Sequence, residues 1–205
     1  MNKRPPKNGE RIKITNTLLV DGNALFKLSF FGAKSEYNHR GEHIGGLYLF
    51  LSILRKLLTE NIYHRVYVFW DGKLSGKLRY QIYPEYKISR GKDYVNGNVP
   101  DPSELRQKAL LWNYLEDLCI RQLRHEFVES DDFIGYYCIN KKQHEHITIC
   151  TTDRDMCQLI QDDIRIYFCD LKKYVDKSNY SSFFCHHNEN SALIKIITGD
   201  NSDCI

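Results

Sequence analysis

Nine carboxylates stand in five short groups along the chain, each beside an expected boundary of a strand or helix. They are Asp21, Asp71, Glu129, Asp131, Asp132, Asp153, Asp155, Asp200 and Asp203. In one cleft, so many negative charges would repel one another strongly unless divalent cations neutralised them. Carboxylate oxygens without nearby cysteine or histidine ligands favour Mg²⁺ or Mn²⁺ over zinc. The pattern therefore predicts a metal centre.

Two such ions, roughly 4 Å apart, can hold a phosphodiester, activate a water and stabilise the leaving oxygen. The predicted chemistry is in-line hydrolysis. Each acid taken alone also fits a structural role, because Asp21 or Asp71 could be a turn residue after a strand. Asp131 and Asp132 could instead complement a helix dipole. The prediction depends on the joint pattern rather than on any one acid.

A second group of residues lies between Lys73 and Pro100, a segment rich in lysine, arginine and tyrosine and poor in aliphatic residues. Its cations are Lys73, Lys77, Arg79, Lys87, Arg90 and Lys92, interleaved with Tyr80, Tyr83, Tyr86 and Tyr94. Cations bind phosphates and aromatic faces stack on bases, a combination suited to single-stranded nucleic acid. Taken alone, the segment could also be a solvated basic loop.

Short apolar runs predict the strands that position these groups. They cover residues 17–20, 65–70, 146–151 and 164–168, and the first three are followed by an acid. Helices are expected over residues 44–58, 103–124 with Ser103 as N-cap, 130–140, 155–161 and 189–198. This alternation predicts an α/β fold with a mainly parallel central sheet flanked by helices. In such folds the site lies beyond the carboxyl ends of the strands, where Asp21, Asp71 and Asp153 would converge.

Composition sets the broad class of the protein. The 205 residues are 42% hydrophobic with a net charge of +3, an ordinary globular balance. The 7 cysteines form no Cys-x-x-Cys pair and are odd in number, so we expect reduced, mostly buried thiols. Residues 1–13 are predicted to be a flexible basic tail without the apolar stretch of a signal peptide. No membrane span is expected, and we predict a cytoplasmic monomer.

The acidic groups, taken in order, resemble the 5′-nuclease family of flap endonucleases and 5′–3′ exonucleases, which has a PIN-like fold. The motifs are VDGN at 20–23, FWDG at 69–72, ESDD at 129–132, TTDRD at 151–155 and GDNSD at 199–203. The resemblance implies two Mg²⁺ or Mn²⁺ ions. It assigns the first ion to Asp21, Asp71, Glu129 and Asp131, and the second to Asp153, Asp155, Asp200 and Asp203. Asp132 would be a ligand relay or a helix cap.

The segment YPEYKISR at 83–90 resembles the arch motif of that family. The resemblance implies a basic arch over residues 73–100, through which a 5′ single strand passes. Lys87 and Arg90 would be catalytic cations that contact the scissile phosphate and stabilise its developing charge. Tyr86 would stack on a base near the cut. Arg79 and Tyr83 would also belong to the nucleic-acid surface, with Arg79 supporting the arch.

The C-terminal end departs from the family pattern, because Cys204 replaces the usual asparagine and the sequence stops at Ile205. We therefore expect a catalytic domain over residues 14–205 without the duplex-binding module of the family. The implied substrates are DNA with a 5′ flap or 5′ end and an RNA–DNA hybrid. Replication proteins are the implied partners, in the cytoplasm or in a host cytoplasm if a phage encodes the chain.

Two other functions compete with this interpretation. A PIN-type ribonuclease would share the acidic cleft, but it would generally lack the basic arch and the last acidic motif. A non-catalytic or partner-dependent nucleic-acid-binding subunit would bind forked DNA in a salt-sensitive way without metal-dependent turnover. A substrate panel with and without metal separates the three.

Overall fold

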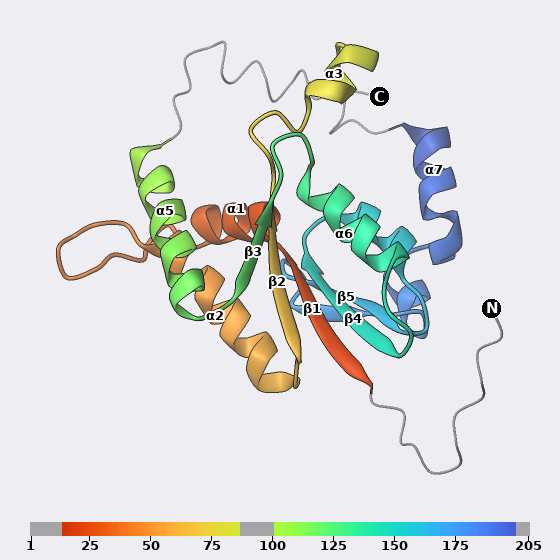
Figure 1. The fold of residues 1–205 in the computed structure, drawn as a ribbon, viewed down its shortest axis with the longest axis horizontal. Coiled ribbons are helices and arrows are strands. Elements are labelled where there is room, and N and C mark those ends of the chain that lie inside the picture. The colour runs from red at the N-terminus through yellow and green to blue at the C-terminus, as the bar shows by residue number, and fades with distance from the viewer. Residues whose placement is uncertain (1–13, 87–100, 200–205) are drawn as a thin grey trace.

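The computed structural model describes residues 14–86 and 101–199, and a six-stranded sheet runs through its centre (Figure 1). The strands are β1 (Thr15–Asp21), β2 (Arg65–Trp70), β3 (Arg121–Arg124), β4 (Glu145–Thr151), β5 (Ile164–Phe168) and β6 (Lys173–Val175). Their order is β3-β2-β1-β4-β5-β6. All neighbouring pairs are parallel except β5 with β6. The predicted α/β fold with a mainly parallel sheet is confirmed.

Helices cover both faces of the sheet. One face packs against α1 (Gly22–Gly32), α2 (Gly45–Glu60) and α5 (Pro102–Asp117), and the other against α6 (Ser130–Ile139) and the 3-10 segment η1 (Arg154–Leu159). Strand β1 shows why its sequence is continuously apolar. Leu18 and Val20 enter the first core, whereas Leu19 between them enters the second. A strand buried on both faces needs apolar residues at every position.

The strand order reverses at β1, with β2 and β3 on one side and β4, β5 and β6 on the other. Open α/β sheets bind ligands in the crevice outside the carboxyl ends of the strands at such a reversal. Helix α3 (Lys77–Ile82) stands beyond this edge, and α7 (Ser191–Thr198) packs beside η1 (Figure 1). The topology therefore places the residues that follow β1, β2 and β4 together.

The helix predicted over residues 103–124 is wrong at both ends. It begins after Asp101, whose carboxylate accepts a hydrogen bond from the Ser103 N–H at 2.8 Å, so Asp101 and not Ser103 is the N-cap. It ends before Cys119, where φ is 55°, and residues 121–124 form the edge strand β3. The Gln122 side chain anchors this strand, because it accepts from Trp70 Nε1 and donates to the Trp112 carbonyl.

The remaining elements lie close to their predicted ranges. The expected helix at 155–161 is a 3-10 segment, and α7 starts at Ser191 and ends at Thr198, before Gly199, where φ is 76°. Helices α1 and α3 and the antiparallel strand β6 are not among the predicted elements. Four of the six described cysteines are buried, and all six are free thiols. Among the helices of residues 14–86 and 101–199, none combines the length and apolar character needed to cross a membrane.

Candidate metal centre

A cavity of about 750 Å³ opens beyond the carboxyl ends of β1, β2 and β4. Six of the nine predicted acids line it, namely Asp21, Asp71, Glu129, Asp131, Asp153 and Asp155. They come from four separate segments of the chain, the first at Asp21 and the last at Asp155. We call this space the metal cavity. Asp132 faces a neighbouring groove instead, and Asp200 and Asp203 lie outside the described residues.

Ser130 holds the first two acids in place. Its backbone N–H donates to Asp71 Oδ1 at 2.8 Å, and its hydroxyl donates to Asp21 Oδ1 at 3.1 Å. Thr151 at the end of β4 donates to the other Asp21 oxygen at 3.1 Å, and the N–H of Ala24 also donates to Asp21. The orientation of Asp21 is therefore fixed from three elements. Sequence reasoning missed Ser130, although it lies inside the ESDD motif.

Burial raises the pKa of two of these acids. It raises the pKa of Asp21 to about 6, and the negative charge of Asp71 adds to this effect. Burial also raises the pKa of Asp131 to about 7, with a further contribution from the charges of Glu129 and Asp132. Opposite charge lowers such pKa values, so a bound cation would stabilise the ionised acids.

The donor set fits a hard divalent cation. Oxygens of Glu129, Asp131 and Asp132 all lie within 4.8 Å of one another, which is close enough to share one ion. Among the described residues, the other side chains that line the metal cavity include no cysteine or histidine. Carboxylate oxygen ligands without sulfur or imidazole suit Mg²⁺ and Mn²⁺. The residues present therefore fit the metal predicted from the sequence.

Arg79 links α3 to the acids at the start of α6. Its guanidinium forms ion pairs with Glu129 and, at 2.7 Å, with Asp132 Oδ1. Tyr86 also contacts this cluster, because its hydroxyl donates to Glu129 Oε2 at 3.3 Å. Its ring lies against Tyr80 and under the Arg79 guanidinium and is 7% exposed. The prediction that Tyr86 stacks on a base does not fit this arrangement, because the ring is buried.

Of the other residues predicted to bind nucleic acid, Tyr83 is described by the structure, whereas Lys87 and Arg90 are not. Tyr83 is 36% exposed, and its hydroxyl donates to Glu85 Oε2 at 3.1 Å. Lys87 and Arg90, the predicted catalytic cations, lie outside the described residues together with the rest of the arch to residue 100. The basic tail at residues 1–13 also lies outside them. The structure therefore describes the beginning of the predicted arch and its attachment to the acids.

A lysine on α7 reaches the second group of acids. The Lys195 ammonium pairs with Asp155, and both residues line the metal cavity. Asp153 accepts the N–H of Asp155 at 2.9 Å, and its own N–H donates to Thr151 Oγ1. Sequence reasoning missed Lys195, whose only signal is that it is the single charged residue of an otherwise apolar or neutral helix.

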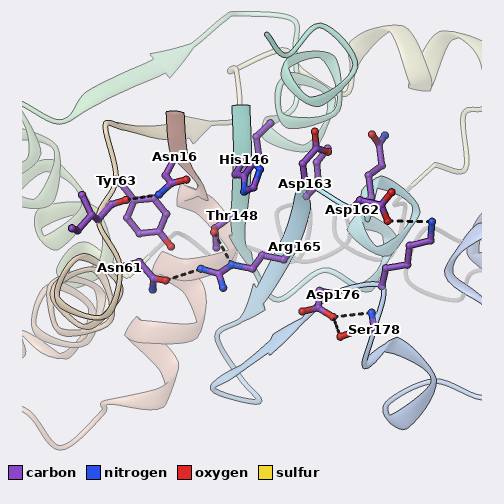
Figure 2. Close-up of a pocket in the computed structure, with 15 residues that line it drawn as sticks. Asn16, Asn61, Tyr63, His146, Thr148, Asp162, Asp163, Arg165, Asp176 and Ser178 are labelled. Carbon is purple, nitrogen blue, oxygen red and sulfur yellow. Dashed lines mark hydrogen bonds and ion pairs between the residues drawn. The ribbon is translucent and has the colours of Figure 1, made fainter. Parts of the chain in front are cut away.

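A separate cavity of about 490 Å³ lies at the opposite, amino-terminal end of β1, β4 and β5 (Figure 2). Its central cation is Arg165, which donates to Thr148 Oγ1 at 3.1 Å and to Asn61 Oδ1 at 2.7 Å. The guanidinium of Arg165 is therefore already hydrogen-bonded to other side chains of the protein. Asp162 and Asp163 line this cavity, at the end of the sheet opposite to the one that holds the metal cavity.

The sequence of residues 16–188 matches the family described as 5′-3′ exonuclease, N-terminal resolvase-like domain. The chain belongs to this family. A DNA polymerase I from Thermus caldophilus is 32% identical over 151 residues, which are 73% of this chain and 17% of that protein. A 5′-3′ exonuclease from Mycoplasma genitalium is 28% identical over 196 residues, covering 91% of this chain and 65% of that protein. The predicted family is confirmed.

Solved structures of phage T5 proteins share the fold of this exonuclease domain. The T5 5′-exonuclease with bound zinc ions has a TM-score of 0.68 and 21% identity, covering 93% of this chain and 69% of that one. A T5 flap endonuclease complex with DNA and metal ions has a TM-score of 0.67 and 20% identity, over 93% and 68%. The 5′-nuclease fold with a PIN-like core is therefore shown.

Replacing Arg79 by Gln is expected to destabilise the metal-free protein by roughly 1–3 kcal/mol, because the buried Glu129 loses its ion pair with Arg79. Mg²⁺ should reduce this loss by supplying positive charge to the same acids. Thermal unfolding in EDTA and in Mg²⁺ measures both effects. Arg106→Gln is the matched control, since Arg106 is also 35% exposed and pairs with Glu42 on the surface. An equal loss in both buffers would contradict the prediction.

Proposed function

We propose that this domain is a metal-dependent 5′-nuclease, which hydrolyses phosphodiester bonds near 5′ ends of DNA, at 5′ flaps and in RNA primers paired with DNA. The observation that carries the proposal is the metal cavity. Six carboxylates from four separated segments meet at the strand-order reversal, in a chain that belongs to the 5′-3′ exonuclease family. Such a concentration of acids is costly in the folded protein without a functional use.

Two Mg²⁺ or Mn²⁺ ions are the proposed cofactors. Asp21, Asp71, Glu129 and Asp131 would hold the first ion, and Asp153 and Asp155 would hold the second with Asp200 and Asp203. Bound ions supply an activated water and stabilise charge on the attacking and leaving oxygens. The chain orients its own ligands through Ser130, which donates to both Asp21 and Asp71.

Positive side chains around the acids are suited to bind the phosphates of the substrate. Lys195 lines the metal cavity from α7, and Lys27 lines it from α1. We propose that Lys87 and Arg90 add two further cations at the scissile phosphate. DNA bound in the solved T5 flap endonuclease complex supports a DNA substrate for this fold. The proposed setting is replication or repair, in a cytoplasm and beside replication proteins.

A 5′-labelled flap duplex tests the proposal directly. With Mg²⁺, the protein is expected to release short 5′ products, and EDTA is expected to stop their release. Asp153→Asn should abolish cleavage because it removes a proposed ligand. Asp162→Asn, at the opposite end of the sheet with a side chain that is 90% exposed, should cleave normally. A folded protein that shifts forked DNA without any release would instead identify a non-catalytic binding subunit.

A further inference from the structure

The lining of the metal cavity holds a seventh carboxylate among the described residues, that of Asp170. It follows β5, two residues after Phe168, and it belongs to none of the acidic motifs of the sequence. The other six acids lie at the ends of β1, β2 and β4 or at the start of α6. A carboxylate in this place could bind a metal ion or support the acids that do, and its contacts decide between these two roles.

The carboxylate of Asp170 forms a bidentate ion pair with Arg154. Arg154 Nη1 donates to Asp170 Oδ1 at 3.2 Å, and Arg154 Nη2 donates to Asp170 Oδ2. One guanidinium therefore engages both oxygens, in the planar geometry in which arginine and carboxylate pair most strongly. A metal ion could bind Asp170 only by displacing Arg154. The geometry thus favours the supporting role.

Two further contacts fix the guanidinium of Arg154. Its Nη1 also donates to the carbonyl of Thr152 at 3.0 Å, and its central carbon lies 4.2 Å from the centre of the Phe168 ring. The Arg154 side chain lines a groove beside α7 and is not among the residues that line the metal cavity. Arg154 therefore connects the turn after β4 to the end of β5 from outside the cavity.

The turn that Arg154 holds carries two proposed ligands of the second ion. Asp153 and Asp155 flank Arg154 in the sequence and line the metal cavity. The N–H of Asp155 donates to Asp153 Oδ1 at 2.9 Å, so the two acids are also coupled to each other. A shift of the backbone at residue 154 would therefore move both carboxylates. Metal ligands generally depend on outer partners that orient them in this way.

We propose that Asp170 is a positioning residue for the second ion, acting through Arg154 on Asp153 and Asp155 without binding the ion itself. The inference rests on the proposed two-ion nuclease function, which assigns these two acids to that ion. Loss of an outer partner of a metal ligand typically lowers metal affinity by tenfold or more. Because the contact acts through geometry, a substitution that keeps the charge of residue 154 should also weaken the site.

Arg154→Lys separates geometry from charge, because lysine keeps the positive charge and loses the planar bidentate contact. In a titration of the protein with Mn²⁺ alone, followed by electron paramagnetic resonance, one of the bound ions should bind roughly tenfold more weakly. Arg154→Gln removes a positive charge, which by charge alone would strengthen cation binding, yet it should also weaken it. Arg106→Lys and Arg106→Gln are the matched controls, since the Arg106 pair with Glu42 is similarly exposed and does not line the cavity.

Asp170→Asn identifies the role of the carboxylate. It should weaken Mn²⁺ binding as Arg154→Gln does, and the double variant should lose no more than Arg154→Gln alone, because one contact cannot be lost twice. A ligand role for Asp170 gives opposite signs instead. Asp170→Asn would weaken Mn²⁺ binding, and Arg154→Gln would strengthen it by releasing both oxygens. That result would overturn the proposal, as would wild-type Mn²⁺ affinity in Arg154→Lys.

Hydrogen exchange in EDTA follows the turn without metal or cleavage. Backbone amides of residues 152–156 should exchange faster in Asp170→Asn and Arg154→Lys than in the wild type, whereas those of α2 should not change. Unchanged exchange at the turn would overturn the proposal even if the wild type cleaves DNA. Faster exchange in a protein whose wild type binds no Mn²⁺ would support the ordering of the turn by Asp170 and overturn the metal-dependent nuclease function.

Discussion

Asp131→Asn should reduce Mg²⁺-dependent cleavage by at least about a hundredfold and, at pH 8, stabilise the metal-free protein. The first effect follows from the loss of a metal ligand, since a bound ion contributes several kcal/mol to transition-state stabilisation and each 1.4 kcal/mol changes the rate tenfold. The same substitution thus separates the function of the site from the stability of the fold. Single-turnover cleavage of a flap duplex measures the loss.

The gain in stability follows from the raised pKa of Asp131. Burial and the charges of Glu129 and Asp132 raise it to about 7 in the folded protein, whereas an unfolded aspartate titrates near 3.9. At pH 8 the folded protein must therefore carry an unfavourable ionised carboxylate, which asparagine removes. Thermal unfolding in EDTA should show a higher melting temperature for the variant. The difference should shrink as the pH falls toward 4.

Asp162→Asn is the control for both measurements, because its side chain is 90% exposed and lies at the end of the sheet opposite to the metal cavity. A lower melting temperature for Asp131→Asn at pH 8 would show that the contacts of Asp131 stabilise the folded protein by more than its buried charge destabilises it. Normal cleavage by the variant would remove Asp131 from the metal ligands.

The second large effect is a pH-dependent stabilisation by Mg²⁺. Without metal, Asp21 and Asp131 bind more protons in the folded protein than in the unfolded chain between pH about 4 and about 7, because their pKa values are raised. The free energy of unfolding of the metal-free protein is therefore expected to fall as the pH rises through this window. Mg²⁺ competes with these protons, so its apparent affinity should rise from pH 6 to pH 8.

A ligand at 100 times its dissociation constant stabilises the folded state by about 2.7 kcal/mol. For a domain of this size, such a gain raises the melting temperature by roughly 5–10 °C. Calorimetry at pH 6, 7 and 8, in EDTA or in saturating Mg²⁺, measures the difference. KCl at matched ionic strength is the control for charge screening. A stabilisation that does not change with pH would mean that Asp21 and Asp131, whose pKa values are raised, are not the metal ligands.

The positions of the acids could be predicted because the strands before them are buried on both faces. The runs at 17–20 and 65–70 are apolar at every residue or nearly so, and Asp21 and Asp71 come directly after the apolar residues. Parallel strands bring such ends to one edge. The contact between Arg79 and Glu129 could not be predicted in the same way. It joins residues 50 apart through the placement of α3 above α6, which no local pattern encodes.

The errors in the predicted elements have local causes. The amphipathic pattern of α5 continues past residue 117, but Cys119 adopts a left-handed conformation, which non-glycine residues rarely adopt and composition does not signal. Strand β6 spans only Lys173–Val175, too few residues to show an alternating pattern. The resemblance to the family's arch motif implies that Tyr86 stacks on a base, whereas its side chain is buried in the structure. Its burial depends on Tyr80 and on the ion pairs of Arg79.

The ion pairs of Arg79 with Glu129 and Asp132 have a consequence for the order of binding. The guanidinium occupies oxygens that a divalent ion would also use, so cation occupancy and the position of α3 are thermodynamically coupled. If Mg²⁺ weakens the ion pairs between these acids and Arg79 of α3, then a substrate that moves α3 away from the acids strengthens Mg²⁺ binding by the same factor. Bound substrate would then raise the affinity for the cation, and bound cation would raise the affinity for the substrate. Neither would need to bind tightly alone.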